Sequence, residues 1–324
     1  MLQLNEKVKK ININQIFNKM GLLLVLIVFI VLMTFLSPSF ASWNNIRNLL
    51  IQSTVLVTLS LGVTFVIITG GIDLSVGAIE ALSAAIGLDM IVNHNVPIVV
   101  GLFIILAIGL IFGLLNGIFV AQFGVPPMIA TLATLSIARG IVLVYTNSAN
   151  VYAPPSFTSL TSHYFLGLPL IVWLVVIFIV IAWIVLSRTI FGRSIYAVGG
   201  SELAARLAGI RTKLIVIIAY MISGFTAALA GILLTIRLES AGANAGDGVE
   251  MNVIAAVVIG GTSLFGGRGT IPGTVIGVIL ISLISNAVNL LGVPPAWDKI
   301  VKGVVIAIAC LLDVYRNRSG KRVH

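Results

Sequence analysis

The sequence contains few charged residues. Asp, Glu, Lys and Arg make up only 9% of its 324 residues, whereas a soluble domain normally carries about 25%. Hydrophobic residues make up 59%, and the mean hydropathy is +1.17. So few charges cannot cover a surface that faces water on all sides. The composition therefore excludes a soluble globular protein.

The sequence also lacks the common signatures of catalysis and metal binding. Its single cysteine, Cys310, excludes an internal disulfide. The three histidines, His94, His163 and His324, lie far apart and lack the spacing of metal ligands. No segment fits the phosphate-binding loop G-x-x-x-x-G-K-[ST] or the nucleophile elbow G-x-S-x-G. We therefore expect neither an enzyme nor a resident cofactor or metal.

What the sequence does contain is a series of long apolar runs. A helix needs about 20 apolar residues to cross the hydrocarbon core of a bilayer. Backbone in lipid must be hydrogen-bonded internally, which leaves helices or a closed barrel, and the alternating pattern of barrel strands is absent. We predict an all-α polytopic membrane protein with about ten transmembrane helices. The expected spans cover about residues 20–36, 51–69, 75–92, 98–121, 128–146, 168–187, 214–236, 251–265, 271–291 and 297–314.

The basic residues indicate how these spans are oriented. The formal net charge is +9 at pH 7, and most Lys and Arg residues lie in three segments between or beyond the spans. Because cytoplasmic loops carry an excess of Lys and Arg, we expect residues 1–19, 188–213 and 315–324 in the cytoplasm and the loop 147–165 outside. Residues 20–314 then form a single transmembrane domain with both termini cytoplasmic. Such a distribution does not indicate a nucleic-acid partner.

Two glycine-rich stretches interrupt the apolar pattern, at 70–75 and at 260–271, where we expect broken or re-entrant elements. Glycine admits backbone angles that end a helix, and Asp73 and Ser75 can cap the helix that follows the first stretch. An acid at membrane depth is also a candidate for function, so a cap and a gate both remain open. The internal similarity of "VIITGGIDLSVG" (66–77) and "VVIGGTSLFGG" (257–267) indicates either two related halves or chance. The candidates for a translocation path or gate in these stretches are Gly70, Gly71, Asp73, Ser75, Gly260, Gly261, Thr262 and Ser263.

The cytoplasmic segment 188–213 contains the pattern of one short helix. Ser201 suits the N-cap, Glu202 suits the positive helix end, and Gly209 suits the position after the helix. The pattern places Leu203, Ala204, Leu207 and Ala208 on one face, with Glu202 and Arg206 as an i,i+4 pair on another. Such a helix can dock into a groove on a partner or lie against lipid headgroups. The residues concerned are Ser201, Glu202, Leu203, Ala204, Ala205, Arg206, Leu207, Ala208 and Gly209.

Four motifs in a fixed order carry a resemblance to a known family. They are "TGGIDLSVGAI" (69–79), "GRSIYAVGGSELAARLAGI" (192–210), "AAVVIGGTSLFGGRGTIPGTVIG" (255–277) and "NAVNLLGV" (286–293). The chain resembles the ribose-type permeases of bacterial ABC sugar importers. This group includes permeases for ribose, xylose, galactose and autoinducer-2 and is related to the branched-chain amino-acid permeases. The resemblance covers about residues 20–314.

The resemblance implies a multi-pass subunit in the bacterial cytoplasmic membrane and a set of partners. These are a second permease subunit, identical or not, a cytoplasmic ABC ATPase, and an extracytoplasmic sugar-binding protein. The helix at 201–209 would be the coupling helix that contacts the ATPase. A related permease for a nucleoside, autoinducer-2 or a branched-chain amino acid is the alternative. A self-sufficient secondary transporter or channel would need a site for a coupling ion, and the spans hold few acids.

Further polar residues within the spans are candidates for the path. Arg139 requires an acid, backbone carbonyls or water at its depth, and Glu80 and Asp89 are candidate partners. Three asparagines can hydrogen-bond sugar hydroxyls or tie helices together. The path candidates in this group are Arg139, Asn116, Asn286 and Asn289.

Overall fold

The computed structural model describes residues 13–158, 163–294 and 296–320, and helices form most of its regular structure. The helices are α1 (Ile13–Leu36), α2 (Trp43–Ile68), α3 (Val76–Val92), α4 (Ile98–Ala121), α5 (Pro127–Thr146), α6 (Pro155–Thr158), α7 (Leu170–Arg188), α8 (Ile190–Gly200), α9 (Glu202–Leu207), α10 (Thr212–Leu238), α11 (Val249–Ile259), α12 (Ile271–Leu290) and α13 (Ala296–Gly320). The strands are β1 (Val151–Tyr152), β2 (Tyr164–Phe165), β3 (Leu168–Pro169) and β4 (Ser240–Ala241).

The strands are short additions to an all-α architecture. β1 pairs antiparallel with β4, so that Val151 lies opposite Ala241, and β2 pairs antiparallel with β3. The sequence pattern did not predict them. Two residues per strand are too few to show an alternation of polar and apolar side chains, and the pairing β1–β4 joins loops that are distant in sequence.

Six helices among the described residues are long and apolar enough to cross a membrane: α2, α4, α5, α7, α10 and α12. This confirms a polytopic helical membrane protein but not the expected count of about ten. α3 has 17 residues, and α11 has only 11. At 1.5 Å per residue α11 is about 16 Å long, roughly half of the hydrocarbon thickness. The expected span 251–265, for which we predicted a broken or re-entrant element, is helical only as far as Ile259.

The centre of the protein is formed by α2 and α10. In the most apolar window of α2, 83% of the residues are buried within the protein, compared with 22% for α4 and α7. α10 packs against α2, α3 and α4. Its approach to α4 is close, since a Cβ atom added at Gly109 would lie 2.3 Å from the carbonyl oxygen of Gly224. Small residues allow such contact between membrane helices, and the apolar outer faces of α4 and α7 suit lipid.

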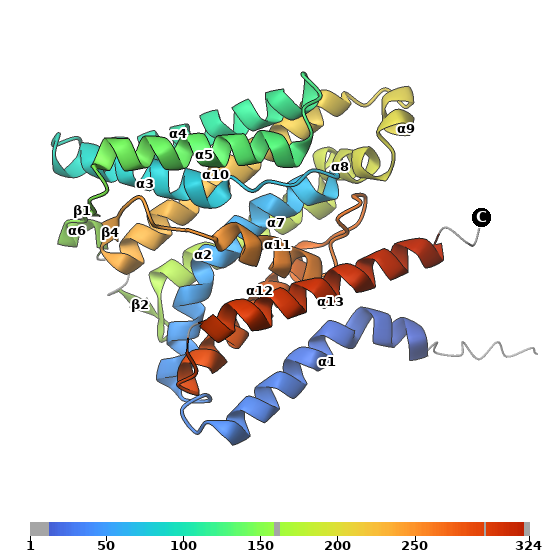
Figure 1. The fold of residues 1–324 in the computed structure, drawn as a ribbon, viewed down its shortest axis with the longest axis horizontal. Coiled ribbons are helices and arrows are strands. Elements are labelled where there is room, and N and C mark those ends of the chain that lie inside the picture. The colour runs from blue at the N-terminus through green and yellow to red at the C-terminus, as the bar shows by residue number, and fades with distance from the viewer. Residues whose placement is uncertain (1–12, 159–162, 295, 321–324) are drawn as a thin grey trace, which may run out of the picture.

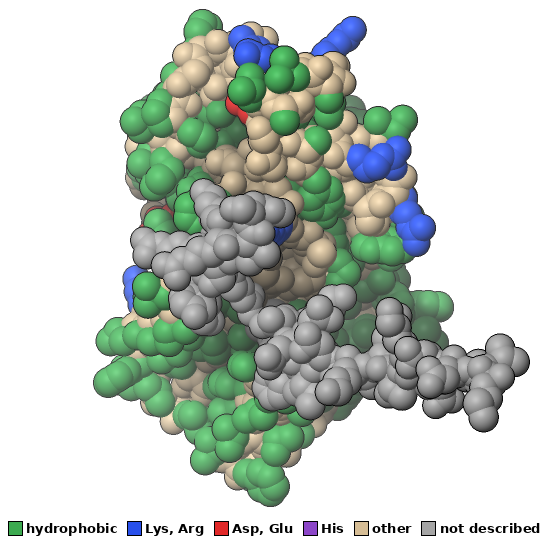
Figure 2. Space-filling view, turned by 90° about the vertical axis from the view of Figure 1, so that its right-hand side faces the viewer, with side chains coloured by type: hydrophobic (Ala, Val, Ile, Leu, Met, Phe, Trp, Pro, Cys, Tyr) green, Lys and Arg blue, Asp and Glu red, His purple; other side chains and the backbone are tan. Residues whose placement is uncertain are grey.

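The two ends of the molecule differ in charge. The beginning of α1, the end of α13, α8 and α9 lie toward one end, while β1, β4 and α6 lie toward the opposite end (Figure 1). Figure 2 looks at the first of these ends, where Lys and Arg side chains are more prominent than acidic ones. The exposed basic residues of α7 to α10 and of the loop after α11 are Arg188, Arg193, Arg206, Arg211, Lys213 and Arg268. Of the expected cytoplasmic segments, residues 1–12 and 321–324 lie outside the described residues.

Candidate functional site

The first helix break begins where α2 ends. The N–H group of Gly70 donates to the carbonyl of Ile67 (2.9 Å), and that of Gly71 donates to the carbonyl of Val66 (3.1 Å). These two bonds, with Gly70 at a φ of +87°, form a Schellman motif. A positive φ is unfavourable for residues with a side chain. The prediction that Gly70 and Gly71 end the helix is confirmed.

A buried chain of hydrogen bonds ties this break to three other helices. One carboxylate oxygen of Asp73 accepts from the N–H (2.9 Å) and the hydroxyl (2.6 Å) of Ser75, and the other accepts from Ser223 on α10 (2.7 Å). The hydroxyl of Ser75 accepts from the amide of Asn116 on α4 (2.8 Å), and that amide accepts from Thr134 on α5 (2.5 Å). Asp73, Ser75, Asn116 and Ser223 are fully buried, so their polar groups pair with one another.

The expectation that Asp73 and Ser75 cap α3 is wrong for the side chain of Ser75, and Asp73 bonds only the residue before the helix. Asp73 accepts the backbone N–H of Ser75, which directly precedes α3. Ser75 occupies the N-cap position, but its side chain makes no capping bond. The reason is that its hydroxyl donates to Asp73 and accepts from Asn116 instead. Asn116 ties α4 to this break, one of the two roles that the sequence left open.

The second helix break repeats the backbone geometry of the first. At the end of α11, Gly261 has a φ of +90° and donates to the carbonyl of Val258 (2.9 Å), and Thr262 donates to that of Val257 (3.2 Å). Gly261 stands at the place of Gly70 in the internal similarity noted above. The two similar segments therefore form the same Schellman motif. Gly260 is the C-cap, and Thr262 and Ser263 are buried, but no acid replaces Asp73 here.

The loop after α11 and the end of α2 meet at the end of α8. The N–H group of Gly267 donates to the carbonyl of Ile68 (2.8 Å), the last residue of α2. A Cβ atom added at Gly199, near the end of α8, would lie 1.7 Å from the same carbonyl oxygen and 2.6 Å from the nitrogen of Gly267. We call Ile68, Gly199, Gly266 and Gly267 the glycine junction. It joins the ends of both helix breaks to the segment that precedes α9.

Arg139 binds backbone carbonyls rather than an acid. Its guanidinium donates to the carbonyl of Ala245 (2.8 Å) and to that of Ala243, in the non-helical stretch between β4 and α11. Within the described residues it forms no ion pair with Glu80 or Asp89. Backbone carbonyls outside a helix or strand need other donors, and Arg139 supplies them for two residues. The sequence contained the partners but no sign of which one the fold would bring close.

Glu80 lies fully buried beside this stretch. Its carboxylate oxygens have no hydrogen-bond partner among the described residues. A Cβ atom added at Gly246 would lie 2.5 Å from one of these oxygens. The glycine therefore lets the stretch pass close over the carboxyl group.

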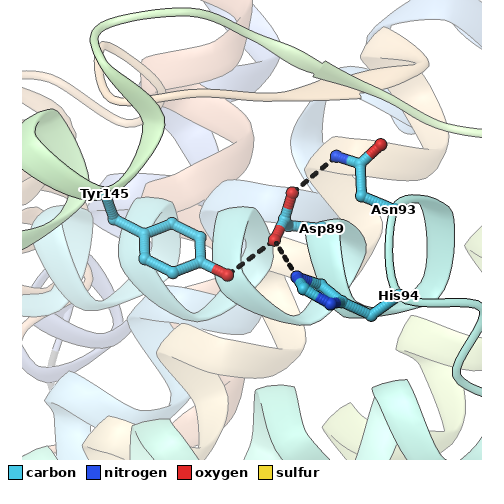
Figure 3. A network of polar contacts seen from close by, with 4 residues as sticks. All are labelled: Asp89, Asn93, His94 and Tyr145. Atoms are coloured by element: carbon cyan, nitrogen blue, oxygen red, sulfur yellow. Dashed lines mark hydrogen bonds and ion pairs between the residues drawn. The ribbon is translucent and has the colours of Figure 1, made fainter.

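Asp89 belongs to a separate polar cluster at the end of the molecule that carries β1 (Figure 3). It accepts from the hydroxyl of Tyr145 (2.6 Å) and from the amide of Asn93 (2.6 Å), and it lies 3.6 Å from a ring nitrogen of His94. Asp89, Asn93 and Tyr145 border a surface cavity of about 370 Å³. The cluster joins α3 to α5. The sequence pattern did not predict the contact of Tyr145, because it depends on how these two helices pack.

Two of the candidate asparagines, Asn286 and Asn289, lie on α12 and differ in environment. Asn286 and Asn45 exchange a reciprocal pair of amide hydrogen bonds, at 3.0 and 2.8 Å, which ties α12 to the beginning of α2. Asn289, less than one turn later, is exposed. Asn286 therefore joins helices, whereas Asn289 stays accessible on the surface of this chain.

The short helix in the basic segment begins and ends as predicted. The hydroxyl of Ser201 accepts from the N–H of Ala204 (3.3 Å), which confirms the N-cap. Gly209, at a φ of +82°, donates to the carbonyl of Arg206 (3.0 Å), and Ile210 donates to that of Ala205 (3.0 Å). α9 therefore ends in a third Schellman motif.

The exposed face of α9 is apolar at its centre. Leu203 is 60% exposed and Leu207 80% exposed, with Ala204 and Ala208 exposed beside them, while Ala205 is buried. The expected pair of Glu202 and Arg206 does not form within the described structure. Glu202 instead accepts from the hydroxyl of Thr212 on α10 (3.2 Å), because the chain turns back toward α10 directly after α9.

The sequence matches a known family of membrane proteins. A family model described as "Branched-chain amino acid transport system / permease component" matches residues 45–310. The chain belongs to this permease family. The matched range contains both helix breaks, the glycine junction and α9, so these are features of a membrane transport component.

Several curated relatives of this permease carry names of sugar permeases. It is 44% identical to the ribose import permease protein RbsC of Bacillus subtilis over 96% of this chain and 97% of the relative. It is 39% identical to the RbsC protein of Haemophilus influenzae over 90% and 92%. It is 36% identical to the D-allose transport system permease protein AlsC of Escherichia coli over 94% of both chains. No solved structure matches the chain.

Proposed function

We propose that this chain is the permease subunit of an ABC importer that moves a ribose-like monosaccharide across the bacterial cytoplasmic membrane. The observation that carries this proposal is the identity of 39–44% to ribose import permeases over nine-tenths or more of the chain. The sequence contains no phosphate-binding loop of its own. ATP is therefore hydrolysed on a partner subunit, and this chain is not an enzyme.

The topology has ten crossings, with the termini and the segment 188–213 in the cytoplasm. Support comes from the basic residues at the end of the molecule that carries α8 and α9, and from the position of both described chain ends at that same end. α1, α3, α11 and α13 join the six helices that are long and apolar enough to cross on their own. The eighth crossing combines the non-helical stretch 242–248 with α11. In this crossing, Arg139 satisfies two carbonyls that helix geometry would otherwise pair.

The path candidates act mainly by shaping the helix breaks. Because Asp73, Ser75 and Asn116 are buried within one subunit and bond to one another, they hold the first break in place rather than touch a solute. The second break, at 260–271, contributes Gly266 and Gly267 to the glycine junction. Asn289, which is exposed on α12, remains a candidate contact for the solute or for the second permease subunit.

α9 is the docking helix for the ATPase. Its exposed apolar face of Leu203, Ala204, Leu207 and Ala208 can enter a groove. Its position at the basic end of the molecule puts it on the side where an ATPase has access to ATP. An extracytoplasmic sugar-binding protein delivers the solute at the opposite end, and a second permease subunit completes the membrane domain.

The substrate class is tested by uptake into proteoliposomes that contain this chain, its ATPase and its binding protein. Labelled ribose should accumulate only with ATP inside, and excess unlabelled ribose or allose should reduce the accumulation. Leucine and adenosine should leave it unchanged. Accumulation that responds to leucine or adenosine and not to sugars would assign the chain to the related permeases instead.

The orientation is tested by cysteine labelling in a Cys310→Ser background. A membrane-impermeant reagent added to intact cells should label Ser156→Cys, which lies in α6, and should miss Ser201→Cys. After the membrane is opened, both variants should react. Labelling of Ser201→Cys from outside would overturn the orientation, and with it the assignment of α9 as the docking helix.

A further inference from the structure

The end of α8 contacts two other segments through backbone atoms, without side chains in between. At Gly199 an added Cβ atom would overlap the carbonyl oxygen of Ile68 at 1.7 Å and approach the nitrogen of Gly267 at 2.6 Å. At Gly266 it would lie 2.8 Å from the carbonyl oxygen of Gly199 and 3.1 Å from the nitrogen of Gly70. Contact at this range leaves no room for either partner to shift independently.

Two hydrogen bonds hold the same three segments together. Gly267 donates to the carbonyl of Ile68 (2.8 Å), which links the loop after α11 to α2. The hydroxyl of Tyr196, one turn before Gly199 on α8, donates to the carbonyl of Gly269 (2.7 Å). α8 is thus bonded to the loop of the second break, and that loop is bonded to the helix of the first break.

α8 continues almost directly into α9. α8 ends at Gly200, and Ser201 is both its C-cap and the N-cap of α9. The N–H of Ser201 still donates to the carbonyl of Ala197 in α8 (3.1 Å). A displacement of α9 therefore moves Gly199 with it, since only one residue separates Gly199 from the N-cap.

We propose that Tyr196 and Gly199 are positioning residues that transmit a displacement of α9 to both helix breaks at once. The inference rests on the proposed function in one respect, that an ATPase docks on α9. In this arrangement α8 acts as a rigid lever. Its short contact with Ile68 moves the end of α2, and its bond to Gly269 moves the loop that follows α11. Interfaces packed in this way shift between discrete arrangements rather than deform gradually.

The chain offers a matched pair of variants to test this inference. Gly199 and Gly200 are neighbours on α8, and neither has a positive φ. A Cβ atom at Gly200 meets nothing within 4 Å, whereas one at Gly199 meets the backbone of both breaks. The two alanine variants gain the same helix propensity, so a difference between them reports the junction. The exposed face of α9 is unchanged in both.

The measurement is the amount of sugar imported per ATP hydrolysed, in proteoliposomes with the complete importer. Gly200→Ala should keep the wild-type ratio. Gly199→Ala should still bind the ATPase but lower the ratio at least tenfold. Tyr196→Phe keeps the ring and loses only the bond to Gly269, so it should reach the membrane in normal amount and lower the ratio about twofold to fivefold. If Gly199→Ala fails to fold, the ratio measured for Tyr196→Phe tests the inference by itself.

The outcomes separate this inference from the proposed function. A wild-type importer that takes up no sugar would refute the proposed function itself. A working wild-type importer whose Tyr196→Phe variant keeps the wild-type ratio would overturn the role of the junction alone. An equal loss in Gly199→Ala and Gly200→Ala would do the same, since only the Cβ atom added at Gly199 would meet the breaks.

Discussion

The two helix breaks have the same backbone geometry but are held in different ways. Both end in a Schellman motif with a glycine near a φ of +90°. The first is held by buried side chains, because Asp73 and Asn116 connect it to α4, α5 and α10. The second is held through its own backbone atoms, since the N–H of Gly267 donates to Ile68 and the carbonyl of Gly269 accepts from the hydroxyl of Tyr196.

This difference indicates a division of roles between the breaks. A buried network of side chains fixes the first break to the interior of the helix bundle, where a change in one member leaves the others unpaired. The second break contacts the end of α2 and also α8, which leads to α9 at the surface. We therefore expect substitutions in the first break to lower stability, and those around the second to alter coupling more than stability.

The largest effect on stability is expected from Asp73→Ala. It leaves the N–H and hydroxyl of Ser75 and the hydroxyl of Ser223 without their acceptor. Each buried unpaired group costs about 1–3 kcal/mol, so the free energy of unfolding should fall by about 3 kcal/mol or more. Thermal unfolding in detergent measures it. Asp73→Asn keeps an acceptor oxygen for Ser75 and should lose about 1 kcal/mol; an equal loss in both variants would contradict the network.

An intermediate and equal effect is expected from Gly70→Ala and Gly261→Ala. Both glycines have a positive φ, and neither added Cβ atom would meet another atom within 4 Å. The cost is therefore that of the left-handed conformation alone, about 1–2 kcal/mol for each. Thermal unfolding of the two variants in detergent measures both losses. Losses that differ by more than a factor of two would show that the two motifs are not equivalent.

The smallest effect is expected from Thr262→Val in the second break. The hydroxyl of Thr262 is buried and has no hydrogen-bond partner among the described residues. Valine has nearly the same shape, so its introduction removes an unpaired polar group and should stabilise the protein by up to about 1 kcal/mol. A clear loss of stability would show that the second break also depends on a side-chain network, and the contrast with Asp73 would fail.

The sequence predicted the helix ends well because their determinants are local. Gly70 and Gly209 were placed correctly, as was the cap at Ser201, since a positive φ or a capping bond involves residues within four positions. The long-range partners could not be predicted. Asp73 with Ser223, Arg139 with Ala243, and Asn286 with Asn45 are more than 100 residues apart, and their pairing depends on how the helices pack.

The sequence predicted the positions of the apolar segments better than the number of helices that can cross a membrane. Hydropathy locates apolar segments, but it does not show where a break divides one crossing into a helix and a non-helical part. α3 and α11 are shortened in this way, by the stretches 70–75 and 242–248. The expected span 251–265 accordingly includes residues that belong to the loop after α11.

If an ATPase drives this permease through α9, the variant Ala204→Glu should disrupt the contact between them. Ala204 lies on the exposed face between Leu203 and Leu207, so glutamate would bring an unpaired charge into a desolvated contact. ATP-dependent sugar uptake should be abolished while the protein reaches the membrane in normal amount. Glu202→Ala removes one exposed acid and its bond from Thr212, away from the apolar face, and should have a milder effect. Normal uptake by Ala204→Glu, or lost uptake with the ATPase still bound and stimulated, would contradict the account.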